Sequence, residues 1–265
     1  MNIDDWLKQA TYALQESGIS SYRLDAELLL AAAIKKERLH LHAHGDDTLT
    51  DQQLTTANAL LERRKQRVPM GYILGHKEFY GREFVVSPDV LIPRPETETL
   101  IELLPDLPEC VMIDIGTGSG AIAVTAKLEH PAWAVTGCDI DEDALLLAAQ
   151  NADRLGAGVT LRHSDLLTNI DGMFDVIAAN LPYVDREWER SLETDYEPPL
   201  ALFADDHGLA LIDKLLQQVP THLNPHGQVL LEADPEQHAA IIALAKENSL
   251  RHIRTEDYIV CFQKI

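Results

Sequence analysis

The residues best suited to binding a polar ligand lie between two acidic side chains, Asp114 and Asp139. Asp114 belongs to residues 111–115, a short apolar, β-branched run that predicts a buried strand of a parallel sheet. The glycine-rich turn that follows reads Gly116, Thr117, Gly118, Ser119 and Gly120. Glycines accept positive φ and have no Cβ to hold a ligand away from the backbone. Because the helix expected next directs its first amides into the turn, this pattern indicates a nucleotide-like ligand.

The spacing of the glycines indicates which ligand. The dinucleotide fingerprint is G-x-G-x-x-G, whereas the glycines here are spaced G-x-G-x-G directly after Asp114. This version resembles the first motif of S-adenosylmethionine-dependent methyltransferases with a Rossmann-like fold. A second predicted strand, 133–138, ends at Asp139, 19 positions beyond Gly120, where a carboxylate can accept both ribose hydroxyls of an adenosine. The alternative is a tight strand–helix turn with a solvated Asp139.

A second site follows the predicted strand 174–179 and is the tetrad Asn180-Leu-Pro-Tyr183. It resembles the Asn-Pro-Pro-Tyr motif of methyltransferases that modify a nitrogen conjugated to a π system. Such a nitrogen is a weak nucleophile because its lone pair is delocalised. The Asn180 side-chain oxygen and the Leu181 carbonyl can accept its two N–H groups, which directs the lone pair at the cofactor methyl. Pro182 would stiffen the loop, and Tyr183 would offer an aromatic face to the substrate. The alternative is an Asx turn closed by a proline.

Composition limits the partners to be considered. The chain has 265 residues and is 46% hydrophobic, and its 22 Lys and Arg against 43 Asp and Glu give a formal net charge of −21. A surface this acidic repels phosphate backbones, so direct nucleic-acid binding is not expected. The basic run 63–67 is interpreted as the solvated face of a helix.

Neither cysteines nor histidines have metal-site spacing, and no metal is expected. The cysteines stand in or beside apolar runs, where cysteine behaves as a small core residue; they are Cys110, Cys138 and Cys261. The alternating histidines lack an acidic or cysteine partner at a matching spacing; they are His40, His42 and His44. The N-terminus has no signal-peptide pattern and no apolar run approaches a membrane span, so we expect a cytoplasmic protein without membrane association.

The pattern of the chain changes along its length. Residues 1–70 contain short helix-like segments that should pack together as a bundle, over 4–16, 24–34 and 50–67. Residues 78–86 contain two strand-like runs around Gly81, which predict a β-hairpin. We expect three parts: a helical substrate-docking domain over 1–75, a hairpin linker over 76–88 and a methyltransferase domain over 89–265.

From residue 110 onward, strand and helix patterns alternate. Strands are expected over 111–115, 133–138, 159–163, 174–179 and 227–232, and helices over 120–129, 142–155, 207–219 and 235–247. The runs 251–255 and 257–264 lie too close for a helical crossover and should pair antiparallel. The predicted fold is α/β, a Rossmann-like, mostly parallel seven-stranded sheet with an antiparallel C-terminal strand. One edge of it should carry the strand-end residues Asp114, Asp139, Asp165 and Asn180.

Further strings extend the resemblance over nearly the whole chain. In order they are Asp25-Ala-Glu-Leu-Leu-Leu30, Gly71-Tyr-Ile-Leu-Gly75, Glu78-Phe79, Leu91-Ile-Pro-Arg-Pro-Glu-Thr-Glu98, the glycine turn, the tetrad, Glu197-Pro198, Ala201-Leu202 and Gly208-Leu209. Together they resemble the peptide chain release factor glutamine N5-methyltransferase family, and the string 91–98 is the specific part. The resemblance implies methyl transfer from S-adenosylmethionine to the amide nitrogen of the glutamine in the Gly-Gly-Gln loop of bacterial release factors.

The resemblance also implies which residues form the site. The cofactor would be held by Gly116, Thr117, Gly118, Ser119, Gly120 and Asp139, with Asp165 or Leu166 near the adenine. The glutamine would be held by Asn180, Leu181, Pro182 and Tyr183, with Asn180 at the boundary between cofactor and substrate. We also expect Arg94, which stands between two prolines, to contact the substrate.

The chain departs from the family pattern at two positions. Leu181 replaces the family's first proline, and Met70 precedes Gly71-Tyr72. The mechanism uses only the backbone carbonyl at 181, so leucine can serve, at the cost of a looser loop. Asn-Leu-Pro-Tyr is also the tetrad of ribosomal RNA adenine dimethyltransferases, which makes N6-methylation of adenine in RNA or DNA the alternative. The negative charge and the other strings weigh against it.

Residues 185–199 are interpreted as a mobile cover over the site.

Overall fold

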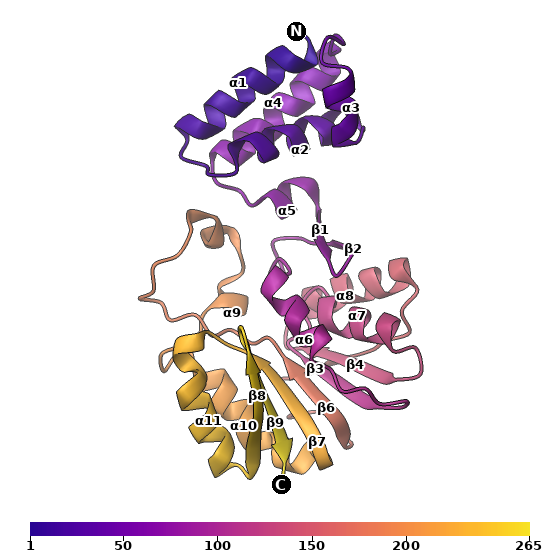
Figure 1. Cartoon of the computed structure of the whole chain (residues 1–265), viewed down its shortest axis with the longest axis vertical. Coiled ribbons are helices and arrows are strands. Elements are labelled where there is room, and N and C mark those ends of the chain that lie inside the picture. Colours follow the sequence, from indigo (N-terminus) through magenta and orange to yellow (C-terminus); the bar gives the residue numbers. More distant parts are fainter. The chain divides into compact units, whose positions relative to one another are not determined.

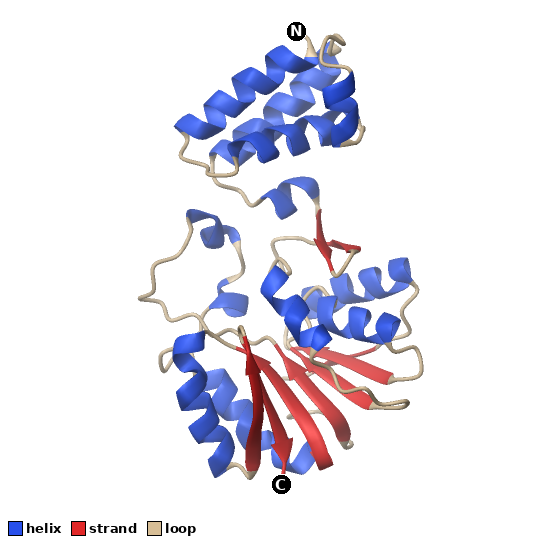
Figure 2. Cartoon of the chain, in the orientation of Figure 1, coloured by secondary structure: helices blue, strands red, loops and turns tan.

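The computed structural model describes residues 1–265 and forms two compact units (Figure 1). The helical unit contains Met1–Gly75 and the short segment Ser191–Tyr196. The sheet unit contains His76–Arg190 and Glu197–Ile265, and it holds every strand of the chain, the hairpin included (Figure 2). None of the helices combines the length and the apolar composition needed to cross a lipid bilayer.

Five helices make up the N-terminal part of the helical unit: α1 (Ile3–Glu16), α2 (Tyr22–Ile34), α3 (Arg38–Ala43), α4 (Asp51–Lys65) and α5 (Met70–Leu74). The sequence predicted α1, α2 and α4. Thr50 begins α4 with a capping box to Gln53, which satisfies amides that the first helical turn leaves free. The sequence did not predict α3 and α5, because helices of six and five residues are too short to show a period. Within α3, His40 and His44 stack with ring centroids 4.1 Å apart.

The core of the helical unit forms where α1, α2 and α4 pack together. Its fully buried side chains include Ile3, Trp6, Ala10, Leu14, Leu29, Leu30 and Ala57. The indole Nε1 of Trp6 donates to Asn58 Oδ1 at 2.8 Å, so its polar atom remains satisfied inside the core.

A buried ion-pair cluster attaches the segment Ser191–Tyr196 to this bundle. Arg64 of α4 donates through Nε to Asp25 at 2.7 Å and through Nη1 to Glu193 at 3.1 Å. The Arg64 and Asp25 side chains are only 7% and 4% exposed. Arg67 reaches the same Glu193 oxygen at 3.2 Å. Glu193 thus has two guanidinium partners, and the pKa of this carboxyl lies below its usual value although burial alone would raise it.

Replacing Arg64 by methionine should lower the free energy of unfolding of the helical unit by about 3–5 kcal/mol, because Asp25 would stay buried without its charged partner. Urea denaturation followed by far-UV circular dichroism measures the change. The control Lys65→Met breaks only the exposed pair with Glu62 and should change the free energy by less than about 0.5 kcal/mol. Equal effects of the two substitutions would contradict a structural role for the cluster.

A seven-stranded sheet in the order β5-β4-β3-β6-β7-β9-β8 forms the centre of the sheet unit. Its strands are β3 (Val111–Ile115), β4 (Ala134–Asp139), β5 (Thr160–His163), β6 (Phe174–Ala179), β7 (Leu223–Glu232), β8 (Leu250–Glu256) and β9 (Ile259–Lys264). The first five in spatial order are parallel, and β9 runs antiparallel between β7 and β8. The predicted fold class is confirmed.

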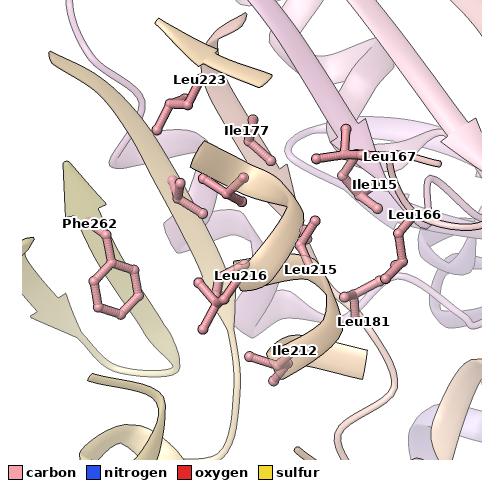
Figure 3. Close-up of a cluster of buried hydrophobic side chains, with 14 of the residues drawn as sticks. Ile115, Leu166, Leu167, Ile177, Leu181, Ile212, Leu215, Leu216, Leu223 and Phe262 are labelled. Carbon is pink, nitrogen blue, oxygen red and sulfur yellow. The ribbon is translucent and has the colours of Figure 1, made fainter. Parts of the chain in front are cut away.

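Helices cover both faces of this sheet, and the alternation along β6 shows why. Val176 and Ala178 join the core beneath α6 (Glu98–Glu102), α7 (Ala121–Glu129) and α8 (Glu142–Leu155). Ile177 and Ala179 point to the opposite face, toward α10 (Ala210–His222) and α11 (His238–Glu247). Figure 3 shows part of this second core. The buried cysteines lie in these two cores, as predicted.

Short elements complete the sheet unit. The predicted hairpin is confirmed as β1 (His76–Phe79) paired antiparallel with β2 (Arg82–Val85). Phe79 and Phe84 are fully buried and meet edge to face, with ring centroids 6.0 Å apart. The sheet unit also has the short helical turns η1 (Pro95–Thr97), α9 (Pro199–Leu202) and η3 (Pro235–Gln237). A further turn, η2 (Leu192–Tyr196), belongs to the helical unit.

Candidate active site

A cavity of about 180 Å³ opens at the carboxyl ends of the adjacent strands β3, β4, β5 and β6. This is where ligands bind in open, doubly wound sheets. The predicted strand-end residues Asp139, Asp165 and Asn180 all line it. Asp114 lies instead beneath the glycine turn, fully buried. Segments 89–94 and 198–201 line it as well.

The glycine turn supplies the floor of the cavity through Gly116, Thr117, Gly118 and Ser119. Gly116 has φ of 71°, and a Cβ added there would stand 3.2 Å from Leu181 Cδ2. The positive φ favours glycine at this position, and a Cβ there would press on the Leu181 side chain of the tetrad. Gly120 begins α7 and packs against Ala148 of α8, so it does not line the cavity.

Asp114 holds the turn from below. Its Oδ2 accepts from the Thr117 hydroxyl at 2.6 Å and from the Ala123 amide at 3.2 Å, whereas Oδ1 is buried without a partner. Burial raises the pKa of Asp114 to about 7, against which these two hydrogen bonds act. The carboxyl therefore joins the turn to the first turn of α7.

The raised pKa of Asp114 predicts a pH-dependent stability. The folded chain holds this proton more tightly than the unfolded chain, so the contribution of Asp114 is lost as pH rises from about 4 to about 7. Asp114→Asn does not titrate. The free energy of unfolding of the wild type minus that of the variant should therefore fall by up to about 1.4 kcal/mol per pH unit across this range. Urea denaturation at several pH values measures it, and a difference that rises with pH would refute the account.

Asp139 connects the glycine turn to the start of α8. Its Oδ2 accepts from the Gly118 amide at 2.8 Å, and its Oδ1 accepts from the Asp141 amide at 3.0 Å. Burial raises the pKa of this carboxyl, and the two backbone amides oppose the rise. Each oxygen retains acceptor capacity, so the side chain can still receive hydroxyl groups of a ligand in the cavity.

Asn151 of α8 fastens the hairpin to the same turn. Its Nδ2 donates to the Ser119 carbonyl at 2.9 Å and to the Val85 carbonyl at 3.0 Å, and its Oδ1 accepts from the Val85 amide at 2.8 Å. The side chain is fully buried. Both polar atoms of this side chain are therefore used to position backbone, a role that no local sequence pattern predicts.

Asp165 and Leu166 follow β5 and line the next part of the cavity. Asp165 is partly exposed and pairs with Lys214 of α10 at 2.6 Å. Leu166 is 7% exposed and has φ of 51°, a left-handed conformation that is uncommon for leucine. The cavity thus has an apolar surface at Leu166 beside a hydrogen-bonding carboxylate at Asp165. A purine ring, which has an apolar face and a polar edge, would fit this combination.

Three of the four tetrad residues line the cavity: Asn180, Leu181 and Pro182. The Leu181 side chain is only 5% exposed and belongs to the same core as Leu166 and Ile212 (Figure 3). The loop is therefore held at position 181 by a buried leucine side chain.

Tyr183 does not line the cavity, which differs from the aromatic face predicted for it. It packs against the core, and its hydroxyl donates to Glu232 Oε1 at 3.2 Å. Its carbonyl accepts from Gln237 Nε2 at 2.8 Å. A Cβ at Gly208 would overlap this carbonyl, so the chain can pass here only as glycine.

The string 91–98 fastens the tetrad to its surroundings. Arg94 lines the cavity and donates to Glu197 at 2.6 Å; the Glu197 side chain is 2% exposed. Burial raises the pKa of Glu197, and the Arg94 guanidinium opposes the rise. Thr97 Oγ1 accepts from Asn180 Nδ2 at 3.1 Å. Glu98 accepts from the Tyr80 amide at 2.8 Å and so holds the hairpin.

The buried polar residues around the site for which the sequence predicted no role include Thr97, Asn151, Glu197 and Glu232. Two of them lie inside strings that carry the family resemblance, which was a usable signal. Glu232 directly follows the apolar end of β7, the same position that drew attention to Asp139 and Asn180. The strand-end rule could therefore have identified it.

Comparison with known proteins identifies the family of this chain. Residues 5–75 match the family described as PrmC N-terminal domain, and residues 95–194 match the family described as Methyltransferase small domain. A release factor glutamine methyltransferase of Koribacter versatilis is 41% identical over 250 residues, which cover 89% of this chain and 89% of the relative. Its namesake from Salmonella typhimurium is 38% identical over 97% of this chain and 95% of its own length. This chain belongs to the release factor glutamine methyltransferase family.

The family resemblance predicted from the sequence is thereby confirmed. Solved structures of other methyltransferases have the same sheet fold as this member of the release factor glutamine methyltransferase family. A methyltransferase from Pyrococcus furiosus aligns with a TM-score of 0.58 at 21% identity, over 77% of this chain and 98% of that protein. A Thermus thermophilus 16S rRNA N2 G1207 methyltransferase aligns with a TM-score of 0.53 at 18% identity, over 72% of this chain and 50% of its own. At these identities the likeness concerns the sheet fold.

Proposed function

We propose that this chain transfers a methyl group from S-adenosylmethionine to the side-chain amide nitrogen, N5, of the glutamine in the Gly-Gly-Gln motif of peptide chain release factors. The family membership supports the reaction class and the substrate. The observation that carries the proposal to the site is the orientation of Asn180. Its Nδ2 donates to Thr97, so its acceptor oxygen remains available in a cavity that Asn180 and the glycine turn line together.

The residues of the cavity fit S-adenosylmethionine. The glycine turn provides backbone without Cβ atoms, Asp139 provides acceptors for ribose hydroxyls, and Leu166 with Asp165 suits an adenine. We propose that these residues hold the cofactor, together with Thr117 and Ser119, and that Gly120 acts through the turn rather than by contact. When bound, S-adenosylmethionine supplies an electrophilic methyl group on a sulfonium centre.

In this proposal the tetrad residues bind and orient the glutamine amide of the substrate. We propose that Asn180 Oδ1 and the Leu181 carbonyl accept the two N–H groups of the glutamine amide, which draws its lone pair out of conjugation and fixes its direction. Pro182 restricts the loop, and Tyr183 anchors it from behind. Positioning of this kind can lower a barrier by roughly 7–11 kcal/mol. Arg94 is paired with the buried Glu197, and its partly exposed guanidinium can meet the substrate backbone.

The reaction is tested by incubating the chain with labelled S-adenosylmethionine and a release factor, and by locating the label with peptide mass spectrometry. One methyl group on the Gly-Gly-Gln glutamine is expected, and none when that glutamine is replaced by alanine. Ribosomal RNA in a parallel incubation should stay unlabelled, since a net charge of −21 disfavours nucleic acid. Label in the RNA alone would favour the adenine N6-methyltransferase alternative.

We place the reaction in the cytoplasm, where release factors meet ribosomes.

We further propose that the helical unit docks the release factor, because a partner of that size needs more surface than the cavity offers. A chain that begins at His76 should lose more of its kcat/KM on the intact factor than on a short Gly-Gly-Gln peptide. Steady-state kinetics with both substrates give the ratio, and the Kd of S-adenosylmethionine serves as the control for a folded sheet unit. Equal losses on the two substrates would contradict the docking role.

A further inference from the structure

Arg94 is the only cationic residue among those that line the cavity. The acidic residues that line it are Asp89, Asp139, Asp141 and Asp165. A guanidinium donates hydrogen bonds and cannot accept them. The direction of the Arg94 side chain therefore decides where a cationic donor meets an oxygen atom of a ligand in this cavity.

Glu197 is a buried acidic residue whose side chain holds that guanidinium. Its Oε2 accepts from Arg94 Nη2 at 2.6 Å. The Glu197 side chain is only 2% exposed and does not line the cavity, whereas the Arg94 side chain is 33% exposed. Because the guanidinium can only donate, Glu197 is the acceptor whether or not its carboxyl is ionised. Glu197 is thus placed to hold Arg94 rather than to touch a ligand.

Prolines restrict the backbone of both partners. Arg94 stands between Pro93 and Pro95 and is extended, with φ of −96° and ψ of 143°. Glu197 is followed by Pro198, and a residue before proline is restricted to extended conformations. The freedom that remains to Arg94 lies in its long side chain, which has many rotamers. The hydrogen bond to Glu197, 103 positions away, restricts this freedom.

The turn that carries Arg94 also contacts the tetrad. The Thr97 amide donates to the Arg94 carbonyl at 3.2 Å, and Thr97 Oγ1 accepts from Asn180 Nδ2 at 3.1 Å. Arg94 therefore lies one turn of chain from the residue that holds Asn180, on the substrate side of the site. In a Gly-Gly-Gln loop the two residues before the glutamine have no side chains, so their carbonyl oxygens are uncovered acceptors.

We propose that Glu197 is a positioning residue that directs the Arg94 guanidinium toward the carbonyl oxygens of the two glycines in the substrate loop. The proposal rests on the proposed function, in which Arg94 contacts the substrate backbone. It assigns a task to a buried residue outside the cavity and names the substrate atoms that Arg94 recognises. These contacts are remote from the reacting nitrogen and are made before and during methyl transfer, so they should act on KM more than on kcat.

The test replaces Glu197 by methionine in the full chain, which removes both acceptor oxygens. We expect KM for a Gly-Gly-Gln peptide to rise by about 10-fold, as the loss of one hydrogen bond to a charged group would give. The kcat and the Kd of S-adenosylmethionine should change by less than about threefold. Glu197→Gln retains an acceptor oxygen and should restore KM to within about threefold of wild type. The control Glu247→Met, at an exposed residue of α11, should behave as wild type.

Variants of Arg94 separate positioning from a simple link between two segments. In Arg94→Lys the ammonium can still pair with Glu197, but it lacks the planar fork of donors, so KM should rise although the link remains. Arg94→Met should raise KM by at least as much as Glu197→Met. The double variant with both methionines should be no worse than Arg94→Met, because Glu197 acts through Arg94.

A measurement without turnover follows the guanidinium itself. In chain labelled with ¹⁵N at arginine, the Nε signal of Arg94 is assigned by its absence in Arg94→Lys. Its order parameter should fall by at least about 0.2 in Glu197→Met, because the side chain loses its fixed end. If Glu197→Met fails to fold, Glu197→Asp decides by the same two measurements, since it keeps the carboxyl but withdraws it from Arg94.

An unchanged KM or an unchanged Arg94 order parameter in Glu197→Met would overturn the proposal. So would a wild-type KM in Arg94→Lys, which would show that the pair only links two segments. A raised Kd of S-adenosylmethionine with unchanged KM for the peptide would assign Arg94 to the methionine carboxylate of the cofactor instead. If the wild-type chain methylates no release factor, the proposed function fails, but the order parameter still reports whether Glu197 fixes Arg94.

Discussion

Asn180→Ala should lower kcat by about 10²–10³, because removing one positioned hydrogen-bonding group at a transition state costs about 3–4 kcal/mol. The structure strengthens this expectation. Asn180 lines the cavity, and Thr97 already holds its nitrogen, so the alanine variant loses both the acceptor and its fixed direction. The Leu181 carbonyl remains, and on its own it can hold only one N–H of the substrate amide.

Single-turnover kinetics with saturating S-adenosylmethionine measure the effect of Asn180→Ala, and calorimetry measures the Kd of the cofactor, which should change by less than about threefold. Asn169→Ala is the matched control, since Asn169 is exposed near the same sheet edge, and should have wild-type kinetics. Near wild-type turnover by Asn180→Ala would remove the tetrad from the mechanism.

Asp139→Ala should raise the Kd of S-adenosylmethionine by about 10²-fold or more. Hydrogen bonds to a charged group contribute about 1.5–3 kcal/mol each, and we propose that this carboxylate accepts two from the ribose. The substitution also frees the Gly118 and Asp141 amides, so the glycine turn loses a support.

Titration calorimetry measures the affinity of Asp139→Ala directly, and kcat at saturating cofactor should fall much less than the affinity. Asp143→Ala, an exposed carboxylate in the first turn of the neighbouring helix α8, is the control and should keep the wild-type Kd. Unchanged affinity in Asp139→Ala would show that its carboxylate only braces the turn.

The elements that carry local patterns were predictable. β3 and β6 have the predicted bounds, since β-branched and apolar runs of five or six residues, ended by a polar side chain, are typical of buried parallel strands. α8 also has the predicted bounds, because Asp141 caps its start and Gly156 ends it in a left-handed conformation. The glycine turn and the tetrad were predictable because their residues are consecutive.

Features that depend on distant contacts were not predictable. The link from Thr97 to Asn180 joins residues 83 positions apart, and no local pattern records it. Ser191–Tyr196 was interpreted as part of a cover over the site, yet it packs with the helical unit through Glu193 and Arg64. Tyr183 was expected to face the substrate because aromatic rings often do, but a buried acceptor at Glu232 draws its hydroxyl inward.

The central claim is that the glutamine amide is held by two acceptors beside the glycine turn. It is tested most directly by a crystal structure of the chain with S-adenosylhomocysteine and a Gly-Gly-Gln peptide. The account predicts the glutamine side-chain nitrogen within about 2.7–3.2 Å of both Asn180 Oδ1 and the Leu181 carbonyl oxygen. A glutamine bound elsewhere, or an Asn180 that turns Nδ2 toward it, would contradict the account.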